Sequence, residues 1–125
     1  PFLKVNHAPA LTYRAMPCFI FKRFAKRVGI EIKREKFKNP QVAKERLDTN
    51  LENNNPVGLQ VGVYNLVYFP DEYRFHFNAH NLIVYGKEQD RYLISDPVME
   101  TVTTLTEKEL EKVRFAKGPF DFLKN

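Results

Sequence analysis

Two polar residues, His80 and Asp96, bracket two short apolar stretches, "HNLIVYG" and "RYLIS", that read as paired strands. If a three-residue loop, 87–89, joins these strands, His80 lies directly opposite Asp96. A carboxylate in that place can accept a hydrogen bond from one imidazole nitrogen and leave the other nitrogen to act as a base. The pattern therefore predicts two members of a catalytic triad.

This prediction depends on the length of the loop. A two-residue loop shifts the pairing by one residue and places Asp96 on the other face of the sheet. The alternative to the catalytic interpretation is that His80 only opens a strand and that Asp96 and Pro97 form an ordinary turn. Both interpretations remain open at the level of the residues.

Cys18 is the only cysteine, so no internal disulfide can form, and a cytoplasmic location is the expectation. It follows Pro17 at a predicted helix start flanked by basic side chains, a setting that favours the thiolate. It is therefore a candidate nucleophile. The alternative is a small buried residue in an aromatic-rich helix.

Two other kinds of site can be weighed. His76, Asn78 and His80 share one face of a predicted strand and could imitate a metal site with Asp96, but their spacing is not typical of zinc, so we expect no metal and no cofactor. The stretch "FIFKRFAKR" could bind single-stranded nucleic acid. Its phenylalanines have the spacing of a buried helix face, so we expect no specific nucleic-acid binding.

Helices are predicted at two places in the first half of the chain. The stretch 16–30 has apolar residues at spacings of three and four, with Gly29 as a stop. Its predicted buried side chains are Phe21, Phe24, Ala25 and Val28. The second helix follows the N-cap Asn39 and has Pro40 at its first position. Its predicted buried side chains are Val42, Ala43, Leu47 and Leu51.

Alternation and β-branched content predict the strands. They cover residues 30–37, 57–69, 75–86, 91–97 and 101–105. A capping box formed by Thr106 and Glu109 opens a last short helix before Gly118. Helices segregated from a mostly antiparallel sheet predict an α+β fold.

Composition and charge limit the remaining choices. The chain has 125 residues, 43% of them hydrophobic, which fits a single domain over 1–125. Its longest apolar stretch is broken by polar residues and falls short of the roughly 18 that a membrane span needs. Residues 1–38 hold ten Lys and Arg against two Glu, a net charge of +8 in a chain of +5. This asymmetry indicates either an acidic partner or a solvated helix face.

The order of motifs as a whole is similar to a known family. "RAMPCFIFKRFAKRVGI", "NNNPVGLQVGVY" and "AHNLIVYG…YLISDP" follow one another as they do in the family of the butirosin biosynthesis protein H N-terminal domain. That family is related to papain-like, bacteriocin-processing cysteine peptidases, and the resemblance covers nearly the whole chain. It implies a papain-like α+β fold with an antiparallel sheet.

The resemblance also implies an activity. It points to a cysteine-dependent acyltransferase of bacterial natural-product biosynthesis, which passes an acyl group from an acyl carrier protein to an amine. His80 would be its general base and Asp96 the orienting partner of that base. An acidic carrier protein would suit the basic first third of the chain.

The chain departs from the family at the nucleophile. The family's cysteine lies upstream of the part that "PFLKVN" resembles, and Cys18 does not match it. We therefore expect the larger C-terminal part of a papain-like domain without its nucleophile helix, inactive alone and prone to self-association. A cysteine peptidase or amide hydrolase, acting on a peptide or amide, is the alternative within the same chemistry. A non-catalytic binding module that retains the fold is the alternative outside it.

Overall fold

The computed structural model describes residues 2–5, 8–11 and 17–118. The chain divides into two compact units, Pro1–Glu35 and Lys36–Asn125. The first unit contains the antiparallel strands β1 (Phe2–Val5) and β2 (Ala8–Leu11) and the helix α1 (Pro17–Val28). The sequence pattern did not predict the two strands.

The predicted helix is confirmed as α1, and its end has a local cause. Gly29 has a φ of +70°, and the amide of Ile30 donates to the carbonyl of Ala25 at 3.1 Å, which is the long bond of a Schellman cap. Of the four side chains predicted to be buried, only Ala25 is; Phe21, Phe24 and Val28 are about half exposed. Apolar spacing shows which side chains share a helix face, but not whether another element covers that face.

The strand predicted over 30–37 does not form. These residues are extended without regular structure and mostly exposed, and Lys33 pairs with Glu35 at 2.9 Å. A strand needs a neighbour whose backbone completes its hydrogen bonds, and alternation in the sequence cannot supply that neighbour.

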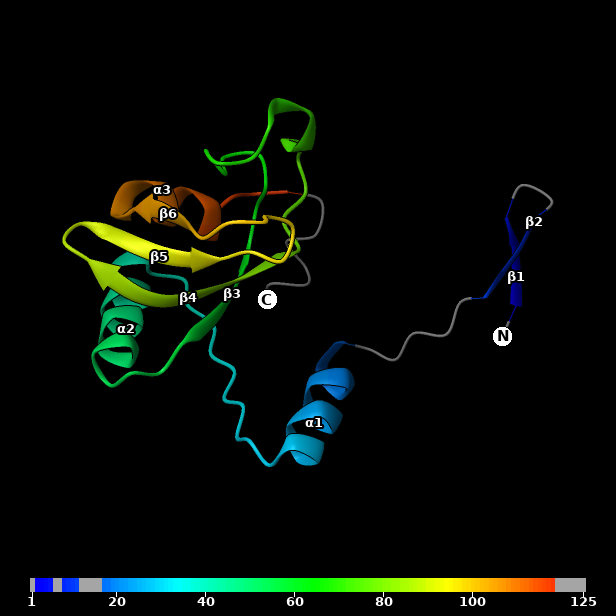
Figure 1. Ribbon diagram of the computed structural model, residues 1–125, viewed down its shortest axis with the longest axis horizontal. Helices are drawn as coiled ribbons and strands as arrows, with labels where there is room; N and C mark the ends of the chain where they lie inside the picture. The colour runs from blue at the N-terminus through cyan, green and yellow to red at the C-terminus, as the bar shows by residue number, and fades with distance from the viewer. Residues whose placement is uncertain (1, 6–7, 12–16, 119–125) are drawn as a thin grey trace. The chain divides into compact units, whose positions relative to one another are not determined.

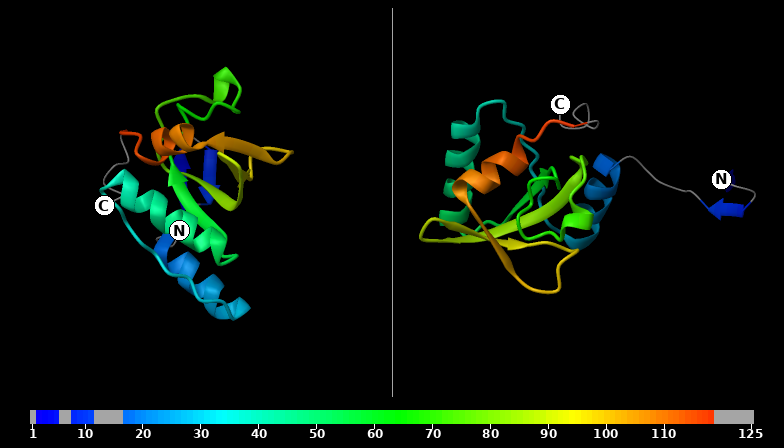
Figure 2. Two further views of the ribbon diagram at one scale, coloured as in Figure 1. Left: turned by 90° about the vertical axis from the view of Figure 1, so that its left-hand side faces the viewer. Right: turned by 90° about the horizontal axis from the view of Figure 1, so that it is seen from above.

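The second unit has an α+β architecture of two layers, a sheet and a pair of helices. Its four strands, β3 (Val57–Val61), β4 (His80–Glu88), β5 (Arg91–Ser95) and β6 (Thr103–Thr106), form an antiparallel sheet in sequence order. Two helices, α2 (Pro40–Glu52) and α3 (Glu107–Arg114), pack on one face of this sheet (Figures 1 and 2). The core between them contains Leu47, Val61, Leu82, Val84, Ile94, Leu105, Leu110 and Val113.

Both helices of this unit begin as predicted. The Asn39 side chain accepts from the amides of Gln41 and Val42, and Thr106 and Glu109 make both bonds of a capping box. Val42 is exposed, contrary to prediction, because the buried stripe of α2 runs through Ala43 and Leu47. Leu51 is partly buried.

Strand β3 ends at Val61 and not at residue 69 as predicted. Turns follow, in which the amide of Leu66 donates to the carbonyl of Val63 and the amide of Phe69 to that of Leu66. Val63, Leu66 and Phe69 are buried. Their spacing of three places them on one side of consecutive turns, whereas in a strand it would alternate faces. A short 3₁₀ helix, η1 (Asp71–Tyr73), follows.

The hairpin between β4 and β5 also differs from the prediction. Glu88 pairs with Arg91, so the loop has two residues, Gln89 and Asp90, and not three. Gln89 has a φ of 56°, the left-handed conformation that such tight turns require. The register then changes at a β-bulge between Val84 and Gly86, so Tyr85 is an extra residue in β4. Strand β4 starts at His80 rather than at residue 75.

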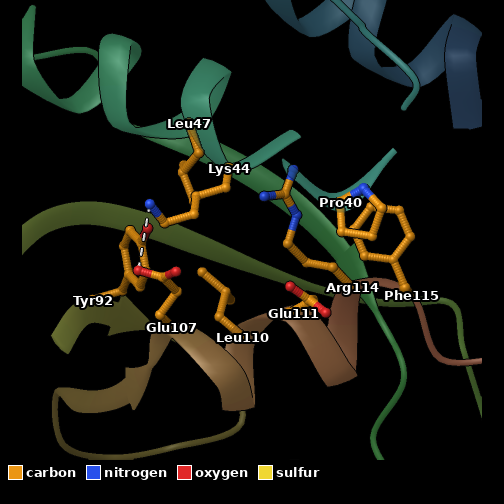
Figure 3. A pocket seen from close by; sticks show the side chains of 9 residues that line it. All are labelled: Pro40, Lys44, Leu47, Tyr92, Glu107, Leu110, Glu111, Arg114 and Phe115. Carbon is orange, nitrogen blue, oxygen red and sulfur yellow. Dashed lines mark ion pairs between the residues drawn. The ribbon is translucent and has the colours of Figure 1, made fainter. Parts of the chain in front are cut away.

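A group of charged and phenolic side chains, which we call the clasp, ties the hairpin end of the sheet to the helices. The Tyr92 hydroxyl donates to Asp48 at 2.7 Å, and the Lys87 ammonium lies 3.2 Å from the same carboxylate. Lys44 of α2 reaches Glu107 of α3 at 3.4 Å (Figure 3). Partial burial acts to raise the pKa of Asp48, but the bonds from Tyr92 and Lys87 outweigh it and hold that pKa below its ordinary value.

No helix in the described ranges combines the length and apolarity that crossing a lipid bilayer requires.

The clasp predicts a pH-dependent loss of stability. Replacing Asp48→Asn turns an amide NH₂ toward a donor, and we expect the free energy of unfolding to fall by about 1–3 kcal/mol at pH 7. Because the folded-state pKa of Asp48 is lowered, its stabilisation is present above the unfolded pKa of about 3.9 and is lost as the pH falls through the folded value. Urea denaturation at neutral and strongly acidic pH measures this.

The matched control is Glu52→Gln, an exposed carboxylate on the same helix, which should change little at either pH. An equal destabilisation by Asp48→Asn on both sides of the acid transition would contradict the expectation.

Candidate active site

The bulge in β4 decides which side chains reach the inner face of the sheet. If the register of the hairpin turn continued unchanged, Asn81, Ile83 and Tyr85 would face the helices, and His80 would face away. Beyond the bulge Val84 pairs with Ile94 and Ile83 with Ser95, so the next step brings Asp96 level with Leu82. His80 lies two residues from Leu82 on the same face. The predicted direct opposition of His80 and Asp96 is therefore wrong, but both side chains share one face as diagonal neighbours.

The structure brings these two side chains into contact. His80 Nε2 lies 2.7 Å from Asp96 Oδ2, within the short range of a charge-assisted hydrogen bond. The Asp96 side chain is fully buried and that of His80 is 12% exposed. An ionised carboxylate only accepts, so Nε2 is the nitrogen that carries the proton. The catalytic role of the pair stays a prediction.

Three donors surround the Asp96 carboxylate. Oδ2 accepts from His80 and, at 2.8 Å, from the Tyr68 hydroxyl, while Oδ1 accepts from the amide of Val98 at 3.0 Å. The amide of Met99 donates to the Asp96 carbonyl at 3.1 Å and closes the turn after β5. A buried carboxylate is tolerated when its oxygens are satisfied in this way.

The imidazole of His80 is held in a defined orientation. Its ring meets the ring of Phe69 edge to face at a centroid distance of 5.4 Å. Nε2 is taken by Asp96, and within residues 17–118 Nδ1 has no hydrogen-bond partner. Nδ1 is thus the nitrogen that can accept a proton from a reacting group.

Sequence reasoning missed two residues of this site, Tyr68 and Phe69. Burial, and then the hydrogen bond and charge of Asp96, raise the pKa of Tyr68 far above its ordinary value, so its hydroxyl stays a donor. Both residues fall within the strand that the sequence predicts over 57–69. The signal that could have located them is the apolar spacing of three from Val63 to Phe69, which predicts turns rather than a strand.

Arg74 fixes the segment 67–74 that carries these two residues. Its guanidinium donates to the carbonyls of Phe69 at 2.9 Å and Val67 at 2.7 Å and pairs with Asp71 at 3.5 Å. This loop is therefore held by side-chain bonds where it lacks a strand partner.

The other sequence-predicted candidates lie elsewhere. Cys18 is the second residue of α1 in the first unit, and its side chain lies outside what the structure describes. His76 stacks on Tyr64 at 4.1 Å beside a cavity of about 90 Å³ that is also lined by Asn78. Across the described residues, no three histidine, cysteine or carboxylate side chains gather where they could hold a metal ion.

The geometry predicts that Asp96→Asn is not a conservative change. All three hydrogen bonds to the carboxylate come from donors, so an amide NH₂ must face at least one of them. We expect a loss of about 1–3 kcal/mol in the free energy of unfolding. Urea denaturation gives this value, and ¹⁵N chemical shifts of His80 report the proton leaving Nε2.

Asp90→Asn, in the exposed hairpin turn, is the control and should change the free energy of unfolding by less than about 0.5 kcal/mol. Equal stabilities for Asp96→Asn and the unmodified chain would mean that the carboxylate is not held by three donors.

Comparison with known proteins places these residues in a family context. A sequence model of one family, described as "Butirosin biosynthesis protein H, N-terminal", matches residues 1–97. The match includes both His80 and Asp96 and stops one residue after the aspartate. No curated protein and no solved structure matches the chain.

Proposed function

Because the chain belongs to the family of the butirosin biosynthesis protein H N-terminal domain, we propose that it supplies the histidine and aspartate of a cysteine-dependent acyltransferase. The family description refers to natural-product biosynthesis, and the proposed reaction moves an acyl group from a carrier-protein thioester to an amine. One observation carries the proposal: the 2.7 Å bond from His80 Nε2 to a buried aspartate, which leaves Nδ1 as a base.

The chemistry follows from that orientation. His80 Nδ1 accepts the proton of a cysteine thiol, and the thiolate attacks the thioester carbonyl. The carrier thiolate leaves and takes the proton from the imidazolium, which Asp96 stabilises in the meantime. The amine then attacks the enzyme thioester, gives a proton to His80, and the cysteine thiolate recovers that proton as the amide departs.

We further propose a papain-like fold and a nucleophile outside residues 1–125. An antiparallel sheet with helices on one face, a histidine at the start of one strand and an aspartate at the end of the next support this fold. Cys18 is the second candidate for the nucleophile. Water in place of the amine would make the protein a hydrolase, which the products of the reaction distinguish.

The test uses the natural protein that contains this chain, an acyl carrier thioester and an amine, with the amide detected by mass spectrometry. His80→Ala should lower kcat by about 10²–10⁴, the contribution of a general base. Asp96→Asn should lower kcat through the wrong tautomer. Cys18→Ser should keep the activity. Iodoacetamide should alkylate a thiol other than Cys18, and it should do so more slowly in His80→Ala than in the unmodified protein.

Full activity of His80→Ala would refute the proposed role of His80 as the general base. Loss of activity with Cys18→Ser, together with fast alkylation of Cys18 that depends on His80, would assign the nucleophile to Cys18 instead. Release of the free acid without formation of the amide would support the hydrolase. Binding of the carrier protein without any turnover would support the non-catalytic binding module.

The proposed carrier protein is acidic, and α1 offers a surface of matching charge. Lys22, Arg23, Lys26 and Arg27 are all exposed, and the first turn of α1 contains no acidic residue. Changing these four residues to Glu should raise the KM for the carrier thioester by about tenfold or more and leave kcat unchanged, because complementary charge acts mainly on encounter. Steady-state kinetics at low ionic strength measure this.

The control is Lys108→Glu with Lys112→Glu on α3, two exposed basic residues of the second unit, and it is compared with the α1 variant of equal charge change, Lys22→Glu with Arg23→Glu. An equal rise in KM for both variants would mean that only net charge matters, and no rise for the α1 variant would exclude this helix as the docking surface.

A further inference from the structure

We infer that Tyr68 is a positioning residue for the His80–Asp96 pair and sets both the orientation of the carboxylate and the strength of its bond to the imidazole. The catalytic part of this inference rests on the proposed function, whereas the effect on the hydrogen bond does not.

Tyr68 and His80 bind the same oxygen of the Asp96 carboxylate. Tyr68 and His80 both donate to Oδ2 of Asp96, at 2.8 and 2.7 Å, whereas Oδ1 accepts from the Val98 amide. Two donors that share one oxygen divide its negative charge between them. The phenol therefore weakens the bond that Asp96 makes to the imidazole, and its removal must strengthen that bond.

Tyr68 also orients the Asp96 carboxylate. Val98 follows Asp96 by two residues, so its amide bond is local and rotates with the turn. Tyr68 comes from the connection between β3 and β4, 28 residues before Asp96. It fixes the carboxylate plane against a separate part of the fold, which a local turn cannot do.

One short segment, Tyr68 and Phe69, contacts both members of the pair. Tyr68 bonds the aspartate, and the next residue, Phe69, packs edge to face on the histidine ring. Arg74 holds the backbone on either side of Tyr68 through its bonds to the carbonyls of Val67 and Phe69. The segment thus controls where the imidazole lies and how strongly its Nε2–H is bound.

The clasp supplies a matched comparison in the same sheet. Tyr92 is buried and donates to Asp48 at 2.7 Å, a bond of the same kind at the hairpin end of the sheet. Any effect of losing a buried tyrosine–aspartate bond as such should appear equally in Tyr68→Phe and Tyr92→Phe.

The experiment records the imidazole N–H resonance of His80 by ¹H NMR in residues 1–125. Tyr68→Phe should move the Nε2–H resonance downfield, because the bond to Oδ2 shortens when its competitor is removed. Tyr92→Phe should leave the resonance in place, although both variants lower the urea midpoint of unfolding.

A second variant covers the case in which Tyr68→Phe fails to fold. Site-specific replacement of Tyr68 by 3-fluorotyrosine keeps the ring and the hydroxyl but makes the phenol a stronger donor. It should move the same resonance upfield, opposite to the effect of phenylalanine. An unchanged resonance in both Tyr68 variants, or an equal shift in Tyr92→Phe, overturns the inference.

In the acyl-transfer assay Tyr68→Phe should lower kcat about tenfold without changing KM, because losing the bond that fixes the carboxylate plane misplaces the imidazole even though its own bond to Oδ2 is stronger. Tyr92→Phe should keep the kcat of the unmodified protein. If the unmodified protein shows no transfer, the proposed function fails, and the NMR shifts still decide the role of Tyr68. If transfer occurs and Tyr68→Phe keeps full kcat, only the positioning role in catalysis fails.

Discussion

The fully buried carboxylate of Asp96 is the constraint around which the second unit is arranged. A charge in that position is costly unless every oxygen meets donors, and the donors come from three places in the chain. Tyr68 belongs to the loop after β3, His80 opens β4, and Val98 follows β5. Satisfying one carboxylate therefore holds together a loop, a strand start and a turn.

The inner face of the sheet has a polar group at each end and apolar residues between. The clasp around Asp48 joins the hairpin end to α2, and the Asp96 group closes the opposite end. Leu82, Val84 and Ile94 lie between them in the core. Each group uses a phenol to donate to a carboxylate, but only one includes a histidine. The same kind of bond thus ties a helix to the sheet at one end and orients an imidazole at the other.

The family match ends at residue 97, yet the hydrophobic core continues beyond it. Leu105, Leu110 and Val113 are buried with the residues of β3 and β4, and the amide of Gly62 donates to the carbonyl of Val113 at 2.8 Å. A Cβ at Gly62 would lie 2.6 Å from the Cβ of Ala116, so the backbone approach here requires glycine. Strand β6 and α3 thus support, from outside the matched region, the start of the loop that carries Tyr68.

The sequence by itself determined the features that residues close together in the chain form with one another. These include the caps at Asn39 and Thr106, the stop at Gly29, and the presence of His80 and Asp96 at the ends of paired strands. Tertiary structure alone decided the bulge at Tyr85, the end of β3 and the place of Tyr68 in the site. A cap needs only three or four consecutive residues, whereas strand register and loop path depend on which side chains the packed core accepts. The predicted register was wrong, yet it placed His80 and Asp96 on one face of the sheet, as the structure does. The two-residue turn alone would have put them on opposite faces, and the bulge shifts the pairing by one residue and reverses that effect.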